Sequence, residues 1–107
     1  METKYIQQET ADRIVKFMEI CEEVHPNIAF KVKDTEECVI YTRNIEKVIS
    51  EIDGGDEEFG FNIIDRETKE VLGWFCILPY EEDFICDCSD NAFCKEVCDR
   101  LENEFGK

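Results

Sequence analysis

The sequence predicts an α+β fold: a small antiparallel sheet packed with about three helices, in the order αββαβββα. Segments near both ends of the chain repeat apolar residues at helical spacing. Between them, short runs alternate apolar and polar residues, as strands with one buried face do. The spacers between these runs are too short for repeated helical crossovers, so the strands should pair antiparallel rather than parallel.

The first element should be a long helix over about residues 4–24. The residues that recur at helical spacing are Ile6, Thr10, Ile14, Phe17, Met18, Cys21 and Val24. Thr3 is a candidate N-cap for this helix. The His25-Pro26 pair should end it, because the residue before a proline disfavours helical geometry.

Two strands and a short helix should follow. A β-hairpin is expected over about residues 28–42, because IAFKVK alternates and CVIYT resumes an apolar run after the polar stretch DTEE. Asn44 is a good N-cap for the helical pattern after it, and Gly54 and Gly55 should stop that helix.

The second half should hold three strands and the last helix. The expected strands are FGFNIID at 59–65, EVLGWFCIL at 70–78 and FICDC at 84–88. The second of these is apolar on both faces, which is typical of a central strand. Ser89 or Asp90 should cap a helix that directs Phe93, Cys94, Val97, Cys98, Leu101 and Phe105 toward the core.

Composition indicates one folded domain over residues 1–107. A chain of this length has the usual size of one domain and should bury roughly two-thirds of its unfolded surface. Hydrophobic residues make up 43% of it, which is too many for a disordered acidic tail.

The net charge restricts the partners. The chain has 27 Asp and Glu against 12 Lys and Arg, a formal charge of -15. This imbalance opposes direct binding to nucleic-acid phosphates or to an anionic membrane. A partner protein should therefore present a basic surface.

The cysteines and the N-terminus predict a cytoplasmic protein. Seven cysteines cannot all pair, and Met1 is followed by a polar run rather than by a signal-peptide pattern. The longest apolar run, VLGWFCIL at 71–78, is too short to span a membrane. Free thiols in a reducing compartment are expected.

The stretch CDCSDNAFCKEVC, residues 86–98, raises the question of a metal. Cys86, Cys88, Cys94 and Cys98 permit an alternative prediction of a four-thiolate zinc site, with the first two on one face of a strand and the last two one helical turn apart. Their spacing lacks the usual C-x2-C turns. Our first prediction is therefore that they are core residues and that the chain holds no metal.

No motif predicts an enzyme or a cofactor. His25 is the only histidine, and its place before a proline favours a capping role or exposure to solvent. Cys94 is the one modest nucleophile candidate, but Asp87, Asp90 and Glu96 should raise its pKa. DGGDEE at 53–58 lacks the ligand spacing of a calcium loop, and no phosphate-binding glycine motif occurs.

The placement of the acids is the most informative feature. Acidic residues near the helix C-termini oppose the macrodipole, at about 0.3–1 kcal/mol each. Others gather where elements end or turn. The candidate partner-binding residues are Glu22, Glu23, Glu36, Glu37, Asp56, Glu57, Glu58, Glu81, Glu82 and Asp83. Carboxylates repeated at about 5–7 Å can imitate successive phosphates, and Tyr41, Tyr80 and Phe84 are candidate apolar anchors.

The sequence therefore predicts a small non-enzymatic inhibitor that acts as a nucleic-acid mimic on a basic protein such as a nuclease. In size and charge it is similar to anti-CRISPR, anti-restriction and nuclease-immunity proteins. Three alternatives remain: a cysteine-rich structural zinc domain, an accessory protein-protein interaction subunit, and an acidic surface that serves solubility alone.

Overall fold

The computed structural model describes residues 8–33, 38–42, 46–48, 58–78 and 84–105, with the backbone alone for Lys33, residues 38–42 and Phe105. Its elements are α1 (Gln8–Val24), β1 (Ile28–Lys33), β2 (Cys38–Thr42), β3 (Phe59–Asp65), β4 (Val71–Ile77), β5 (Ile85–Cys88) and α3 (Ala92–Phe105). Residues 46–48 are helical and lie where the short helix was expected. The predicted α+β class and the order αββαβββα are confirmed.

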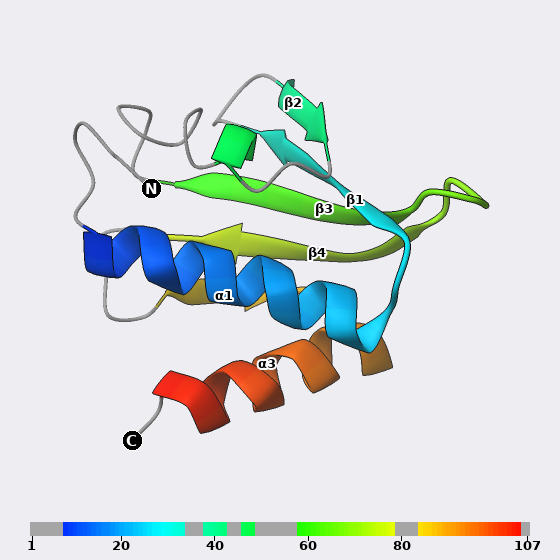
Figure 1. The fold of residues 1–107 in the computed structure, drawn as a ribbon. Helices are drawn as coiled ribbons and strands as arrows, with labels where there is room; N and C mark the ends of the chain where they lie inside the picture. The colour runs from blue at the N-terminus through cyan, green and yellow to red at the C-terminus, as the bar shows by residue number, and fades with distance from the viewer. Residues whose placement is uncertain (1–7, 34–37, 43–45, 49–57, 79–83, 106–107) are drawn as a thin grey trace.

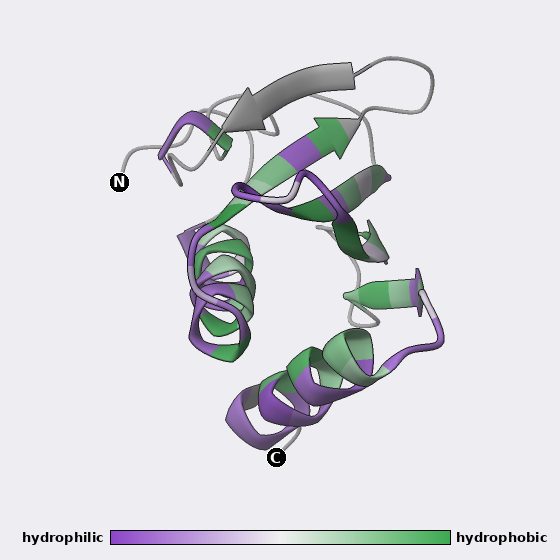
Figure 2. Ribbon diagram, turned by 90° about the vertical axis from the view of Figure 1, so that its right-hand side faces the viewer, coloured by the Kyte–Doolittle hydropathy of each residue, from purple (hydrophilic) through white to green (hydrophobic). Residues whose placement is uncertain are grey.

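The described strands form one antiparallel sheet in the order β2-β1-β3-β4-β5. β1 pairs with β2 and with β3, so the β1–β2 pair joins the consecutive strands β3, β4 and β5 in one sheet. Both α1 and α3 lie against one face of this sheet (Figure 1). Seen from the side, α3 turns its hydrophobic side toward the sheet and its hydrophilic side away from it (Figure 2).

α1 forms because an apolar stripe runs along one of its sides. Its buried residues are Ala11, Ile14, Phe17, Met18, Ile20 and Cys21. Phe17 is the centre of this stripe and meets three aromatic rings edge-on. The centroid distances are 5.0 Å to Phe75, 5.4 Å to Phe61 and 6.2 Å to Phe84. One helical side chain therefore joins α1 to β3, β4 and the segment that leads into β5.

The side of the sheet that faces the helices is apolar, because hydrophobic residues occupy alternate positions along its strands. Ile28, Phe30 and Val32 on β1 are fully buried. Their neighbours across the β1–β3 ladder include Ile63, opposite Phe30. Phe61 lies opposite Phe75 on β4. Aliphatic and aromatic pairs of this kind across the central strands form the sheet side of the described core.

The N-cap of α3 differs from the prediction. Asn91 caps the helix through its Oδ1, which accepts a hydrogen bond from the backbone N–H of Cys94 at 2.9 Å. Ser89 was expected in this role, but its Oγ accepts from the backbone N–H of Trp74 at 2.9 Å. Its own N–H donates to the Trp74 carbonyl. Ser89 thus continues the β4–β5 pairing. α3 begins at Ala92, after Asn91, so neither predicted cap, Ser89 or Asp90, is the N-cap.

The contact of α3 with β4 depends on a glycine. A Cβ at Gly73 would overlap the Cys94 sulfur and lie 3.1 Å from Cδ2 of Phe93. Cys94, Val97 and Leu101 of α3 are buried, and Phe93 and Cys98 pack partly against the core. Gly73 therefore permits the close approach of the helix. Neither of the two helices, α1 and α3, is long and apolar enough to cross a membrane.

Replacing Phe17 by Ala should lower the free energy of unfolding by about 3–5 kcal/mol, because it removes all three ring contacts and leaves a cavity. Urea unfolding followed by circular dichroism measures this loss. Val71, which is 60% exposed, supplies the control, and Val71→Ala should change the stability by less than about 0.5 kcal/mol. Similar losses in both variants would contradict the central role of Phe17.

Gly73→Ala should destabilise the protein by about 1–3 kcal/mol, because the new methyl group meets the Cys94 sulfur. Cys94→Ala removes that sulfur, so the double variant should be more stable than the sum of the two single losses predicts. We expect a coupling energy on the order of 1 kcal/mol in a double-mutant cycle. Additive losses would show that the glycine is needed for another reason.

Candidate partner-binding surface

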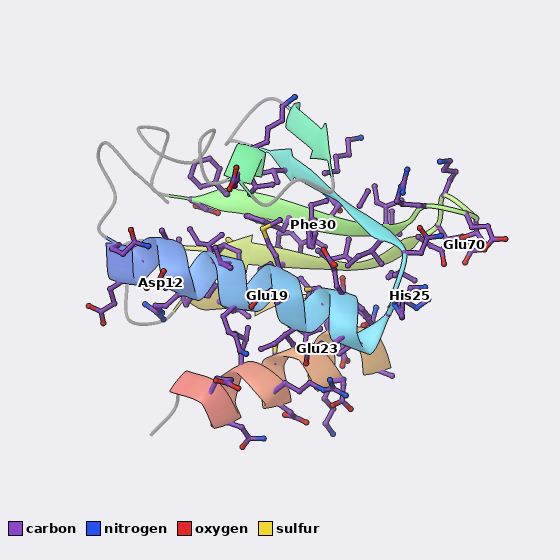
Figure 3. All side chains as sticks on the ribbon, viewed as in Figure 1. Asp12, Glu19, Glu23, His25, Phe30 and Glu70 are labelled. Carbon is purple, nitrogen blue, oxygen red and sulfur yellow. The ribbon has the colours of Figure 1, made fainter. Side chains whose placement is uncertain are left out.

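The solvent-facing side of α1 carries a row of carboxylates. Glu9, Asp12, Glu19 and Glu23 are all exposed. Their spacings of three, seven and four residues put them on one side of a helix, opposite the buried stripe. Figure 3 labels Asp12, Glu19 and Glu23 along the length of α1. Neighbours three or four residues apart on a helix lie about 5–6 Å from each other at Cβ.

α3 lies beside α1 and runs in the opposite direction, as their ion pairs show. Lys16 Nζ lies 3.6 Å from Glu104 Oε1, and Arg100 Nη1 lies 3.4 Å from Glu23 Oε1. Arg100 Nε also donates to Glu96 Oε2 at 2.8 Å within α3. All of these side chains are partly exposed, so solvent screens the pairs and each contributes little to stability. Their main effect is to direct two cations into the seam between the helices.

The two helices together remain strongly negative. Their sequences contain nine carboxylates and four cations. Three of the cations are held in place: Lys16 and Arg100 in the seam, and Arg13 with its guanidinium carbon 4.8 Å from the centre of the Phe84 ring. Neither helix has a basic residue in its last turn. The outward surface of the helical layer is therefore mainly acidic.

Only three of the ten predicted partner-binding residues are described. Glu23 is exposed and Glu22 is half-buried at the end of α1, whereas Glu58 precedes β3 and accepts a hydrogen bond from the Cys76 thiol at 3.1 Å. His25, beside Glu23, contacts Asp65 at the far end of β3. Asp65 therefore marks the end of the sheet near Glu22 and Glu23. Glu58 is seven residues from Asp65, roughly 20 Å along a strand, so it lies apart from Glu22 and Glu23. The residues that lie outside the described part are Glu36, Glu37, Asp56, Glu57, Glu81, Glu82 and Asp83.

One predicted anchor is wrong. Phe84 is 6% exposed and packs against Phe17 under Arg13, so it cannot present its ring to a partner. Tyr80 lies outside the described residues, and of Tyr41 only the backbone is described.

The acidic row on α1 contains three residues that the sequence prediction did not select, Glu9, Asp12 and Glu19. Asp12 accepts a hydrogen bond from Gln8 Nε2 at 2.8 Å. Lys16, four residues after Asp12, contacts Glu104 of α3. The helical spacing of the three acidic residues could have identified them, because it places them on the side of α1 opposite the buried stripe. The sequence prediction instead selected runs of adjacent acids where elements end or turn.

The cysteines of β5 do not share a face as predicted. Phe75 lies opposite Cys88, Cys76 lies opposite Asp87, and the register then shifts so that Ile77 lies opposite Ile85. This bulge inserts one residue and breaks the alternation of the strand. Cys86 becomes exposed and meets the Cys76 thiol, whereas Cys88 faces Cys98 with a sulfur–sulfur distance of 3.9 Å.

The alternative zinc site is therefore not formed by Cys86, Cys88, Cys94 and Cys98. Within the described residues, no group of three or more His, Cys, Asp or Glu side chains is arranged to hold a metal ion. The prediction that these thiols line the core holds for Cys94, which is fully buried, and in part for Cys88 and Cys98, but not for Cys86.

Burial dominates the chemistry of the inner thiols. Burial, followed by the neighbouring Cys88, raises the pKa of Cys94, whereas the sequence had assigned that rise to nearby acids. Burial also raises the pKa of Cys21 well above its usual value, with Cys94 and Cys98 adding to the effect. A buried thiol with a raised pKa is a poor nucleophile near neutral pH.

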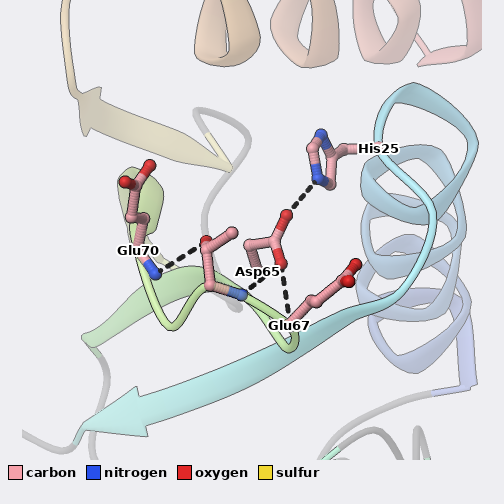
Figure 4. Close-up of polar contacts among 5 residues, drawn as sticks. His25, Asp65, Glu67 and Glu70 are labelled. Carbon is pink, nitrogen blue, oxygen red and sulfur yellow. Dashed lines mark hydrogen bonds and ion pairs between the residues drawn. The ribbon is translucent and has the colours of Figure 1, made fainter.

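His25 and Asp65 join the end of α1 to the β3–β4 turn (Figure 4). His25 Nε2 lies 2.8 Å from Asp65 Oδ2. Asp65 Oδ1 accepts hydrogen bonds from the backbone N–H groups of Glu67 and Thr68 at 2.8 and 3.0 Å. The Arg66 N–H donates to the carbonyl of Asn27, which has a positive φ of 64°. Both oxygens of Asp65 are therefore used to hold the turn against the helix.

These hydrogen bonds change the acidity of Asp65. The Thr68 N–H, then His25, then the Glu67 N–H stabilise the carboxylate and lower the pKa of Asp65 to about 2. The side chain is 18% exposed and that of His25 is 38% exposed. Because both oxygens are occupied, this pair is arranged as a turn anchor.

Comparison of the chain with protein-family models, with curated proteins and with solved structures gave no significant match.

Asp65 should make folding depend on pH in acid. Its pKa is lower in the folded state, so it stabilises the fold above about pH 4, and this contribution is lost as the pH falls from about 4 to 2. Asp65→Asn keeps an oxygen acceptor but cannot ionise. The stability difference between wild type and Asp65→Asn should therefore be larger at pH 6.5 than at pH 2.5 in urea unfolding.

Glu70→Gln is the matched control, because it removes one exposed carboxylate from the same turn. Its stability difference from the wild type should change less over this pH range. A pH-independent difference for Asp65→Asn would contradict the assignment.

Proposed function

We propose that this protein is a non-enzymatic inhibitor that docks the acidic α1/α3 surface on the basic nucleic-acid-binding surface of a larger protein, as a nucleic-acid mimic of the anti-CRISPR, anti-restriction or nuclease-immunity kind. One observation carries the proposal. The helical layer holds nine carboxylates and four cations, and three of those cations are engaged at the seam or against Phe84. The negative charge is thereby left facing outward.

The arrangement of the charges supports a binding role over a purely solubilising one. Lysines at the C-termini of the two helices would maintain solubility and stabilise the macrodipoles, yet both last turns lack basic residues. Glu23 receives its cation from the other helix rather than from α1. Selection for stability alone would not favour this pattern.

A rigid platform makes the mimicry physically efficient. The carboxylates of α1 project from a helix whose opposite side is fully buried, so little backbone order has to be gained on binding. A negative surface of this kind steers a basic partner toward it and raises the association rate. Salt should weaken the complex, as it weakens the binding of nucleic acid to the same partner.

The proposal places the protein in the cytoplasm, where nucleic-acid-handling effectors act and where the cysteines would remain reduced. An accessory subunit with a conventional interface is the competing function, and the response to salt distinguishes it. Its interface would rely on apolar contacts, which salt screens weakly.

The first test is capture by the immobilised chain from a lysate fraction enriched in nucleic-acid-binding proteins, with elution by a rising salt gradient. The proposal expects a basic protein that salt releases and that DNA or RNA displaces. The purified partner should then lose a fluorescent oligonucleotide when the chain is added. A partner that keeps its oligonucleotide, or that stays bound at high salt, would contradict the mimic.

Variants that remove negative charges test whether the acidic α1/α3 surface binds the partner. Asp12→Asn, Glu19→Gln and Asp99→Asn together remove three exposed charges from the two helices. We expect association with the captured partner to slow on the order of 10-fold, measured by stopped flow at low salt.

The matched control removes three exposed charges elsewhere, through Glu46→Gln, Glu67→Gln and Glu70→Gln. Its net charge is identical to that of the first triple variant, and its association rate should stay close to the wild-type value. Equal slowing in both triple variants would show that total charge matters and that the helical surface does not.

A further inference from the structure

Two cysteines from different elements meet at the edge of the sheet. Cys88 ends β5, which is an edge strand, and Cys98 lies in the second turn of α3. Their sulfur atoms are 3.9 Å apart, and both thiols are free. A disulfide has a sulfur–sulfur bond of about 2.05 Å, so bonding requires an approach of roughly 2 Å, on the scale of a side-chain rotation.

The bulge in β5 creates this pairing. It separates Cys86 from Cys88 and leaves Cys88 opposite Phe75 on the side of the sheet that α3 covers. Cys98 lies one turn after the buried Cys94 and at the margin of the helix–sheet contact. A strand without the bulge would have kept Cys86 and Cys88 on one face.

Access distinguishes this pair from the other thiols. Cys88 and Cys98 are both half-buried, so a reagent in solution can reach them. Cys21 and Cys94 are fully buried. On the other face, Cys86 is exposed, but its neighbour Cys76 is only 4% exposed and donates a hydrogen bond to Glu58.

We propose that Cys88 and Cys98 form a reversible oxidation site, at which a low-molecular-weight disulfide such as glutathione disulfide converts the two thiols into a disulfide that joins β5 to α3. This inference is independent of the proposed partner. It concerns the state of the free chain.

The chemistry balances as two thiol–disulfide exchanges. The Cys88 thiolate attacks one sulfur of glutathione disulfide, which forms a mixed disulfide and releases one glutathione thiolate. The Cys98 thiolate then attacks the Cys88 sulfur and releases the second glutathione. The two cysteine protons pass to the two released thiolates, so two protein thiols are oxidised and one glutathione disulfide is reduced to two glutathione molecules.

The order of the steps follows from the surroundings of Cys98. Burial, then the proximity of Cys88, raises the pKa of Cys98 to about 12. Cys98 is therefore a thiol near neutral pH and suits the second, intramolecular step. In that step the mixed disulfide holds the Cys88 sulfur beside it, which compensates for a low thiolate fraction.

The disulfide would close a short loop, from residue 88 to residue 98, around the start of α3. Such a cross-link restricts the unfolded chain and would hold an edge strand of four residues to the helix. Oxidation should therefore raise the thermal midpoint by on the order of 10 °C. A reducing compartment would reverse it.

The test equilibrates the full chain in glutathione buffers of increasing oxidised fraction, quenches with acid, alkylates the remaining thiols and maps the peptides by mass spectrometry. We expect one cross-linked peptide pair that contains Cys88 and Cys98 and has lost two hydrogen atoms, together with a higher thermal midpoint. Dithiothreitol should reverse both changes.

Three variants make the result specific. Cys88→Ser and Cys98→Ser should each abolish the cross-link and the thermal shift, while Cys86→Ser, on the other face, should retain both. The wild-type peptide map does not depend on how well any variant folds. Full alkylation of both cysteines in the most oxidising buffer, glutathionylation without a cross-link, or a cross-link through Cys76, Cys86 or Cys94 would overturn the proposal.

Discussion

The contact of Phe17 with the sheet is the interaction on which the rest of this structure depends. It brings α1 onto β3, β4 and the segment before β5, and it buries the helix stripe that contains Ile14, Met18 and Cys21. Once that side of α1 is buried, the opposite side must face solvent. The acidic row therefore takes its direction from the core, since a helix cannot turn its charges outward without an apolar side to bury.

The second helix shows how a strongly negative protein tolerates its own charge. α3 packs beside α1, and the partly exposed side chains of Lys16 and Arg100 bridge the two helices. These exposed pairs contribute little to stability individually, but they reduce repulsion where two acidic helices lie closest. The same arrangement concentrates the remaining carboxylates on the outer surface. Solubility and partner recognition would then use one set of charges.

Features of the fold that depend on local sequence patterns could be predicted, whereas features that depend on contacts between distant residues could not. The buried side of α1 and the alternation of β1 and β3 could be predicted, because each depends on a local periodicity. β4 was expected to be buried on both faces, but this holds only for Phe75, Cys76 and Ile77, and Val71 is exposed. The N-cap at Asn91 could not be selected over Ser89 or Asp90, because several capping residues stood in a row and the choice depended on Ser89 pairing with Trp74. Likewise, the zinc alternative relied on strand alternation, which the bulge in β5 interrupts.

The sequence by itself determined the class of fold, the order of its elements and the negative charge, since hydrophobic periodicity and composition are properties of the chain. The tertiary structure alone decided which thiols and which charges meet. Cys88 contacts Cys98 because the bulge in β5 and the start of α3 bring the two residues together. Lys16 contacts Glu104 because α3 lies alongside α1. Such contacts join residues distant in sequence, and local propensity contains no information about their separation in space.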